Sequence, residues 1–280
     1  MRIYRTIAEI REFSREKRPL GALAVVPTMG ALHAGHAALM ETAVKDHPFV
    51  VATIFVNPTQ FGNLNDLSNY PRTEDDDLAL LEKAGVSAVF IPQADEIYPE
   101  GDETIVETTS LAGLYHGKVR PGHFRGVATV VSKLFHITEA DYAYFGEKDY
   151  QQLSVIRRMV RDLHFPIKIE GVATVRANDG LALSSRNVRL SEAHRAAAPI
   201  VYRSLVDADT ALKSGASVED AVIQIEELFA SEDLADLKAV DVVYSDNFRP
   251  ASGHPTGTIG IMISAQFGDV LLIDQKEIQL

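Results

Sequence analysis

Two histidines stand three positions apart in a short glycine-bearing stretch near the N-terminus. His33 and His36 follow Gly30 and flank Gly35, directly before a segment with helical periodicity. Glycine lets the backbone turn sharply and approach a ligand closely, and the start of a helix offers free N–H groups and a positive dipole end. Imidazoles there can donate hydrogen bonds to phosphate oxygens. The pattern favours a phosphate-binding loop; ordinary loop or capping histidines are the alternative, and a zinc site lacks an HExxH frame and a third ligand.

A lysine in a second strand-to-helix junction is another candidate for anion binding. Lys148 lies in the stretch Phe145–Gln152, where acidic residues are the usual choice for the first turn of a helix. A cation at such a position is explained by an anion bound beside it. A solvated surface lysine is the alternative.

Two polar loops complete the set of chemical candidates. The stretch Asp179–Asn187 combines the hydroxyls of Ser184 and Ser185 with the guanidinium of Arg186. This combination can clamp phosphate, and it is also compatible with an Asx-turn that leads into a helix. Gln60 follows an apolar run and can donate and accept hydrogen bonds, which suits a small hydroxy acid or an amide.

Two further stretches have a functional and a structural interpretation. Asp75, Asp76 and Asp77 are candidate Mg²⁺ ligands, but in the first turn of a helix opened by Thr73 we expect caps and dipole partners, with Asp76 as the capping partner. The stretch Arg120–Gly126 forms either a cationic lid or the approach to the next helix.

The elements that must position these residues follow an alternating pattern over the first part of the chain. Four short apolar runs predict strands buried on both faces: Leu23–Val26, Val50–Val56, Ala88–Ile91 and Tyr142–Phe145. Amphipathic segments between them predict helices. The alternation predicts an α/β fold with a parallel sheet and right-handed crossovers. Ligands bind outside the carboxyl ends of such strands, so the loops after Val26, Val56 and Phe145 should carry the chemistry.

The pattern changes after about residue 174. Two helices are predicted, opening near Ser191 and Ser217, and three strand-like runs follow: Val240–Tyr244, Thr258–Ala265 and Val270–Ile273. We therefore predict a first domain over 1–174 and a smaller α+β domain over 175–280.

The composition excludes several classes of function. The 280 residues include 27 Lys and Arg against 39 Asp and Glu, a formal net charge of −12. This charge repels polyanions, which argues against nucleic-acid or anionic-membrane partners. The absence of cysteine excludes disulfides and thiolate chemistry and fits a reducing compartment. No signal-peptide core and no apolar run of roughly 20 residues occurs, so we expect a soluble, cytoplasmic protein.

Six segments in this order closely resemble the pantoate–β-alanine ligase family, within the nucleotidylyltransferase superfamily that has the HxGH signature. They are VPTMGALHAGH, IFVNPTQF, YPRTEDDDL, RPGHFRGV, FGEKDYQQL and DGLALSSRN. The resemblance implies a Rossmann-like domain that binds ATP and pantoate, a smaller C-terminal lid domain, Mg²⁺ and a homodimer. Pantoate and ATP would form pantoyl adenylate and pyrophosphate, and β-alanine would then displace AMP to give pantothenate.

The resemblance also implies site residues. His36 would be the proton donor, with His33 and Lys148 as further catalytic residues, and Gln60 and Gln152 would hold pantoate, Gln60 also near β-alanine. The ATP site would comprise Met29, Gly30, Ala31, Leu32, His33, Ala34, Gly35, His36, Gly146, Glu147, Lys148, Asp149, Val175, Leu183, Ser184, Ser185 and Arg186. Metal ligands are not implied. Departures from the family pattern occur at Thr59, LYHGKV and VLLIDQ; they bear on the substrate pocket and the lid.

Two alternative functions are considered. The first shares the expected fold of the ligase family, and the second shares its nucleotide ligand. One is a nucleotidylyltransferase that passes a nucleotidyl group to a phosphorylated acceptor, for which a cationic acceptor pocket is expected in place of Gln60 and Gln152. The other is a non-catalytic nucleotide-binding module, which has no need of two histidines and a lysine together with a hydroxyl-rich loop.

Overall fold

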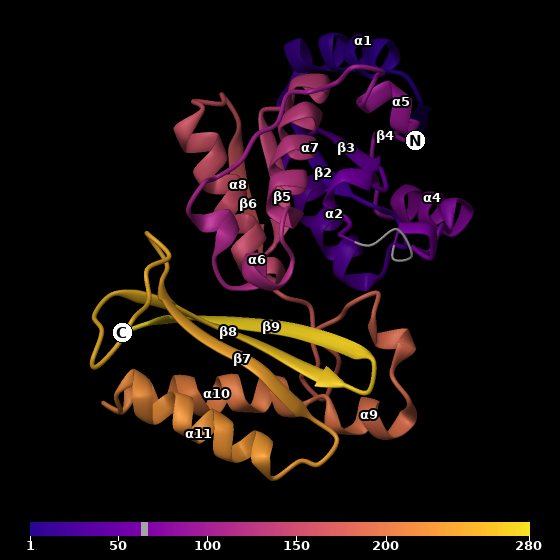
Figure 1. Cartoon of the computed structure of the whole chain (residues 1–280). Helices are drawn as coiled ribbons and strands as arrows, with labels where there is room; N and C mark the ends of the chain where they lie inside the picture. The colour runs from indigo at the N-terminus through magenta and orange to yellow at the C-terminus, as the bar shows by residue number, and fades with distance from the viewer. Residues whose placement is uncertain (63–66) are drawn as a thin grey trace. The chain divides into compact units, whose positions relative to one another are not determined.

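The computed structural model describes residues 1–62 and 67–280, which form two compact units (Figure 1). Unit 1 comprises Met1–Gly146 and Gln151–Ala173, and unit 2 comprises Glu147–Tyr150 and Thr174–Leu280. The four residues Glu147–Tyr150 thus belong to unit 2, although both segments that flank them in the chain belong to unit 1.

Unit 1 is built on a six-stranded sheet in which all neighbouring strands are parallel. The strands are β1 (Arg2–Tyr4), β2 (Leu23–Thr28), β3 (Phe49–Ile54), β4 (Ala88–Phe90), β5 (Tyr142–Gly146) and β6 (Lys168–Val172), in the order β1-β4-β3-β2-β5-β6. The direction of strand addition reverses between β2 and β5, and ligands bind at such a switch point in open α/β sheets. The predicted Rossmann-like parallel sheet is confirmed.

Helices on the two faces of this sheet bury the central strands. The helices of unit 1 are α1 (Ile7–Lys17), α2 (Ala34–Asp46), α4 (Glu74–Lys83), α5 (Ala94–Ile97), α6 (His116–Val119), α7 (His123–Thr138) and α8 (Tyr150–Asp162), the last beginning in unit 2. Ala24 and Val26 of β2 share a core cluster with Met40 of α2. Val25, which alternates with them, points to the opposite face and is also fully buried. Burial on both faces explains why β2 is an uninterrupted apolar run.

The four predicted strands are confirmed, and two edge strands were missed. β1 has only three residues, and β6 contains Lys168, Glu170 and Gly171. An edge strand has one neighbour and is partly exposed, so its sequence lacks the apolar run that marks a buried strand.

In unit 2, the two longer helices α10 (Ile200–Lys213) and α11 (Val218–Ala230) pack on a three-stranded antiparallel sheet. The sheet has the order β7-β8-β9, with β7 (Asp236–Tyr244), β8 (Thr258–Phe267) and β9 (Val270–Gln279), and the shorter helix α9 (Glu192–Ala197) precedes α10. Ser191 and Ser217 are the N-caps of α9 and α11, as predicted. The first predicted helix is split in two, because Pro199 has no N–H to continue α9 and becomes the N-cap of α10.

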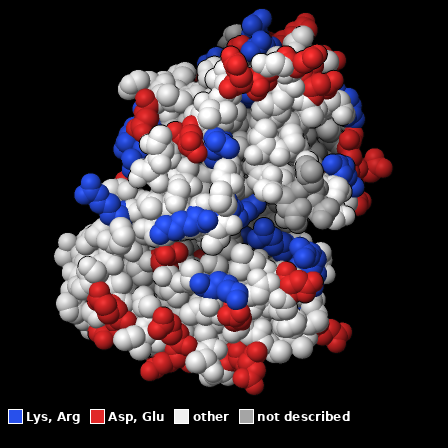
Figure 2. Space-filling model, in the orientation of Figure 1, with Lys and Arg blue, Asp and Glu red and all other residues white. Residues whose placement is uncertain are grey.

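The surface carries the acidic excess of the sequence. Figure 2 shows Asp and Glu side chains spread over the visible face of both units. Among the helices of the described residues, none has the length and apolar character that a membrane span requires.

Replacing the cap of α11 should destabilise unit 2. The Ser217 hydroxyl accepts from the Asp220 N–H at 3.1 Å, and Ser217→Ala leaves that amide without its partner. We expect a loss of about 1 kcal/mol in the free energy of unfolding, measured by urea titration. Ser217→Asn, which can accept the same bond, is the control; an equal loss in both variants would contradict the capping role.

Candidate functional site

The predicted histidine loop connects the end of β2 to the start of α2. Gly30 and Ala31 both have positive φ angles, 81° and 53°, which turn the chain sharply after β2. His33 is the N-cap of α2, so it takes the place that a serine or aspartate usually fills. His33 is therefore a capping residue, as one of the two interpretations expected.

Both imidazoles use the same nitrogen to accept a backbone hydrogen bond. His33 Nδ1 accepts from the Gly35 N–H at 3.1 Å, and His36 Nδ1 accepts from the His33 N–H at 3.3 Å. The ring centroids lie 4.2 Å apart. A nitrogen that accepts carries no proton, so each neutral ring carries its proton on Nε2. The capping arrangement thus orients two N–H donors at the start of α2.

A buried aspartate holds the backbone of this loop. Asp77 is 2% exposed, and its carboxylate accepts from the Ala31 N–H at 2.9 Å, the Leu32 N–H at 2.7 Å and the Thr73 hydroxyl at 3.2 Å. A Cβ at Gly30 would lie 2.9 Å from an Asp77 oxygen, so glycine is needed there for space as well as conformation.

The expected capping role of Asp76 is wrong. The Thr73 side chain makes no cap bond to a helix N–H, and Asp77 turns inward to the histidine loop. Because Ala31 and Leu32 give their N–H groups to Asp77, these two amides are engaged within the loop. No cluster of three or more potential metal ligands occurs in the part of the chain that the structure describes, so the histidine pair has no third zinc ligand there.

Asn57, three residues before Gln60, fixes the orientation of the Gln60 side chain. It caps the 3₁₀ turn η2 (Pro58–Gln60), and its Oδ1 accepts from the Thr59 N–H at 3.3 Å. Its Nδ2 donates to the Gly126 carbonyl at 3.1 Å and to Gln60 Oε1 at 3.0 Å. An amide N–H only donates and a carbonyl only accepts, so these partners identify the two ends of the Asn57 amide.

This network makes Gln60 a directed donor. Its oxygen is engaged by Asn57, while its Nε2 points at the sulfur of Met29, 3.1 Å away. A thioether is a weak acceptor, which a ligand oxygen can replace. The Gln60 side chain therefore accepts at its oxygen, from Asn57, and presents Nε2 as the donor for a ligand.

Tyr98 adds a further hydrogen bond to the network around Asn57. The Tyr98 hydroxyl donates to Asn57 Oδ1 at 2.8 Å, and burial raises the pKa of this hydroxyl above its ordinary value. The phenol therefore keeps the proton that it donates.

The start of α7 packs directly on η2. A Cβ at Gly126 would lie 2.6 Å from the Thr59 carbonyl and 2.7 Å from Gln60 N, and the His123 ring lies 3.0 Å from the Gln60 carbonyl oxygen. Of the two interpretations of Arg120–Gly126, the approach to a helix is the one observed, since α7 begins at His123. This helix start supports Gln60.

Two adjacent glutamines on α8 have different environments. Gln151 is buried and bonds the His116 N–H and the carbonyls of Leu111 and Leu114. Gln152 is half-buried and has no hydrogen-bond partner among residues 1–62 and 67–280. Gln152 is therefore the one with an amide left for a ligand.

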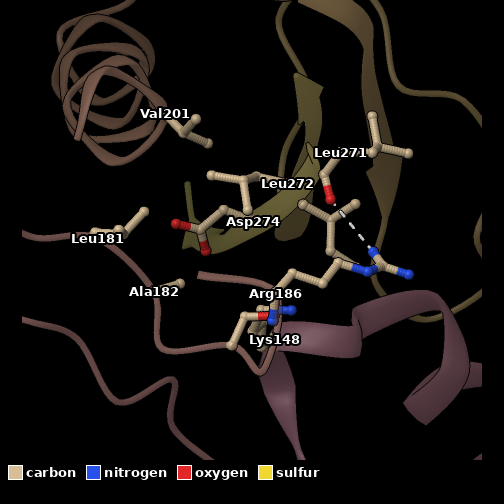
Figure 3. A pocket seen from close by; sticks show the side chains of 10 residues that line it. Lys148, Leu181, Ala182, Arg186, Val201, Leu271, Leu272 and Asp274 are labelled. Atoms are coloured by element: carbon tan, nitrogen blue, oxygen red, sulfur yellow. Dashed lines mark hydrogen bonds between the residues drawn. The ribbon is translucent and has the colours of Figure 1, made fainter. Parts of the chain in front are cut away.

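Unit 2 contains a pocket that brings together three of the other predicted phosphate contacts, Lys148, Ser184 and Arg186, while Ser185 is not among its lining residues (Figure 3). The 3₁₀ turn η4 (Glu147–Asp149) supplies Lys148, and the loop after Val175 supplies Ser184 and Arg186. The remaining lining residues are Leu181, Ala182, Val201, Leu271, Leu272, Ile273 and Asp274.

The loop that carries Ser184 and Arg186 is braced at its base. The Leu183 N–H bonds the Val175 carbonyl at 2.9 Å, and Arg176 pairs with Ala182 in an antiparallel bridge. The Arg186 guanidinium donates to the Leu271 carbonyl at 3.3 Å, the dashed line in Figure 3.

Of the charged groups that line this pocket, the carboxylate is compensated by an ion pair and, among the described residues, the two cations are not. The Asp274 carboxylate is bound by two nitrogens of Arg176, at 2.5 and 3.0 Å, so its charge is compensated. Neither Lys148 nor Arg186 forms an ion pair within the described part of the chain. Two unpaired cations that line one pocket attract an anion.

Comparison with known proteins identifies the family. The model of the family described as pantoate–β-alanine ligase matches residues 2–277. The pantothenate synthetase of Thermus thermophilus is 46% identical over 279 residues, which cover 99% of this chain and 99% of the relative. That of Desulfitobacterium hafniense is 44% identical over 284 residues, covering 100% and 99%.

Solved structures agree with the sequence comparison. The crystal structure of the Thermus thermophilus enzyme matches with a TM-score of 0.93 and 46% identity, covering 100% of both chains. The crystal structure of pantoate–β-alanine ligase from Francisella tularensis, complexed with β-γ ATP and β-alanine, matches with a TM-score of 0.80 and 33% identity, covering 99% of this chain and 97% of that one. By sequence and by fold, this chain belongs to the pantoate–β-alanine ligase family.

Proposed function

We propose that this enzyme condenses pantoate with β-alanine at the expense of ATP, through a pantoyl-adenylate intermediate. The observation that carries the proposal is the family match over nearly the whole chain. The Francisella tularensis relative was crystallised with an ATP form and β-alanine, two of the three substrates of this reaction.

The first step requires a carboxylate to attack a phosphorus that carries anionic oxygens. Two like charges about 4 Å apart repel by roughly 4 kcal/mol at an effective dielectric constant near 20. A bond forms between a carboxylate oxygen and the α-phosphorus, and the bond from the α-phosphorus to the bridging oxygen of pyrophosphate breaks. Lys148 and Arg186, which lack carboxylate partners in the described residues, offset this repulsion and stabilise the charge that develops on the phosphates.

Under this proposal His36 and His33 donate to the leaving pyrophosphate. Their Nδ1 atoms accept backbone hydrogen bonds, so Nε2 is the atom that offers the proton. The further ATP contacts that we assign are the loop Met29–His36, the turn Gly146–Asp149, Val175 and the loop Leu183–Arg186, with Ser184 and Ser185 as hydroxyl donors.

Pantoate is assigned to Gln60 and Gln152. Gln60 presents Nε2 as a donor, which suits the carboxylate and hydroxyl oxygens of a hydroxy acid. In the second step the amine of β-alanine attacks the acyl carbon of the adenylate and AMP leaves. Positioning both groups accounts for this step without a nucleophilic side chain, and Gln60 is also assigned near β-alanine.

In this proposal Mg²⁺ binds together with the nucleotide, through phosphate oxygens and water. The described residues contain no cluster of three potential ligands, whereas Mg²⁺ at nucleotide sites is held largely by phosphate oxygens and water. When bound, the ion supplies neutralisation of phosphate charge. The homodimer, the cytoplasmic location and the lid role of unit 2 stay predictions, and size-exclusion chromatography with light scattering tests the first.

The nearest alternative, a nucleotidylyltransferase acting on a phosphorylated acceptor, is disfavoured by the neutral donor at Gln60. Pantoate-dependent ATP–pyrophosphate exchange, followed by β-alanine-dependent release of AMP, tests the proposal. Exchange without pantoate would favour the alternative, and ATP binding without any turnover would favour a non-catalytic module.

Loss of a phosphate contact should lower the rate with the fold intact. We expect Lys148→Ala and His36→Ala each to reduce kcat by at least ~100-fold, the range found when an electrostatic donor to a transition state is removed. Steady-state kinetics measures the effect, and circular dichroism checks the fold. Lys238→Ala, which removes an exposed lysine paired with Asp236, is the matched control. Near-wild-type turnover in either site variant would remove that residue from the mechanism.

Reversing the polarity of Gln60 should harm pantoate use more than truncating it. Gln60→Ala removes one hydrogen bond to a charged group, so we expect KM for pantoate to rise about 10-fold or more. Gln60→Glu places an acceptor with negative charge in front of the pantoate carboxylate and should raise KM further. KM for ATP serves as the internal control. An unchanged kcat and KM for pantoate in Gln60→Ala would disprove the assignment.

A further inference from the structure

The four residues Glu147–Tyr150 are attached to unit 2 by a buried tyrosine. Tyr150 is 5% exposed, and its hydroxyl oxygen lies 2.7 Å from Ser245 Oγ and 2.7 Å from Glu277 Oε2. A carboxylate only accepts, and a phenol has a single proton to donate. The Tyr150 hydroxyl therefore donates to Glu277 and accepts from Ser245.

The ring of Tyr150 is held as closely as its hydroxyl. It packs on the backbone of Gly260 in the middle strand β8, where an added Cβ would lie 2.5 Å from a ring carbon. Its other neighbour is Phe248, with ring centroids 5.3 Å apart. The turn η4 packs on β9, which carries Glu277. Polar contacts and packing contacts together hold this side chain.

Lys148 stands two residues before this anchor. It is half-buried, lines the pocket with Ser184 and Arg186, and makes no ion pair in the described residues that would hold it there. The backbone of η4 therefore determines where the Lys148 side chain enters the pocket. Since η4 belongs to unit 2 and Tyr150 bonds the same segment to Ser245 and Glu277, the anchor at Tyr150 contributes to the position of Lys148.

We propose that Tyr150, held by Glu277, Ser245 and the glycine surface at Gly260, is a positioning residue that fixes Lys148 in its anion-binding pocket. The inference rests on the proposed role of Lys148 in phosphate binding. It adds a residue that touches no substrate and acts through the placement of a cation.

A double-mutant cycle on the full-length enzyme tests this inference. The probe is inorganic pyrophosphate, with affinity measured by isothermal titration calorimetry. We expect Lys148→Ala and Tyr150→Phe each to weaken binding about 10-fold, and the double variant to bind no more weakly than Lys148→Ala alone. A purely structural effect of Tyr150 would add to that of Lys148, so equal and additive losses would overturn the proposal.

Two further variants separate placement from loss of a polar group. Gly260→Ala pushes on the Tyr150 ring without removing a hydrogen bond, and we expect it to weaken pyrophosphate binding in the same way and with the same lack of additivity. Tyr244→Phe, a matched change on β7 of the same sheet, should leave binding unchanged. Thermal unfolding checks that each variant is folded.

The outcomes also separate this inference from the proposed function. If Lys148→Ala binds pyrophosphate as the wild type does, the phosphate role of Lys148 is wrong. If Lys148→Ala binds weakly while Tyr150→Phe and Gly260→Ala bind normally, the phosphate role stands and the positioning role of Tyr150 is wrong.

Discussion

Electrostatic repulsion between two anions is the constraint on which the proposed chemistry depends. A carboxylate and a triphosphate approach each other only where cations and N–H donors outnumber acceptors, and this chain has an overall charge of −12. The positive field must therefore be local. In unit 2 it is produced by leaving Lys148 and Arg186 without carboxylate partners among the described residues, while the nearby Asp274 is compensated by Arg176.

In unit 1, internal hydrogen bonds determine the orientation of the polar groups that we assign to substrate binding. Asp77 accepts from the N–H groups of Ala31 and Leu32, and Asn57 engages the oxygen of Gln60. The Nδ1 atoms of His33 and His36 accept from backbone N–H groups. Each of these hydrogen bonds satisfies a donor or an acceptor within unit 1. With its oxygen engaged, Gln60 presents Nε2 as a donor, which is the complement of an oxygen-rich substrate. Preorganised donors of this kind cost no reorganisation when charge develops.

The sequence was sufficient where local pattern decides the structure and insufficient where contacts between distant segments decide it. Buried strands such as β2 are apolar runs, and Ser217 begins a helix by its own hydrogen bond, so both were predicted. Asp77 lies 46 positions from Ala31, and Asn57 lies 69 from Gly126. Their roles arise only after folding brings those segments together; an aspartate in a first turn and an Asn-Pro turn have ordinary local explanations. The edge strand β6 was missed because partial exposure removes the apolar pattern.

Tyr150 is a further residue whose proposed role arises from contacts between distant segments. Within the segment FGEKDYQQL, lysine and the glutamines attract attention because they can bind substrates, whereas a tyrosine at the start of a helix is unremarkable in sequence. Its hydrogen-bond partners Ser245 and Glu277 lie 95 and 127 positions away in the chain, and Gly260 is needed to make room for its ring. A flexible lysine gains precision only if its backbone is held. On this view the antiparallel sheet of unit 2, besides forming the core of that unit, supports the turn that carries Lys148.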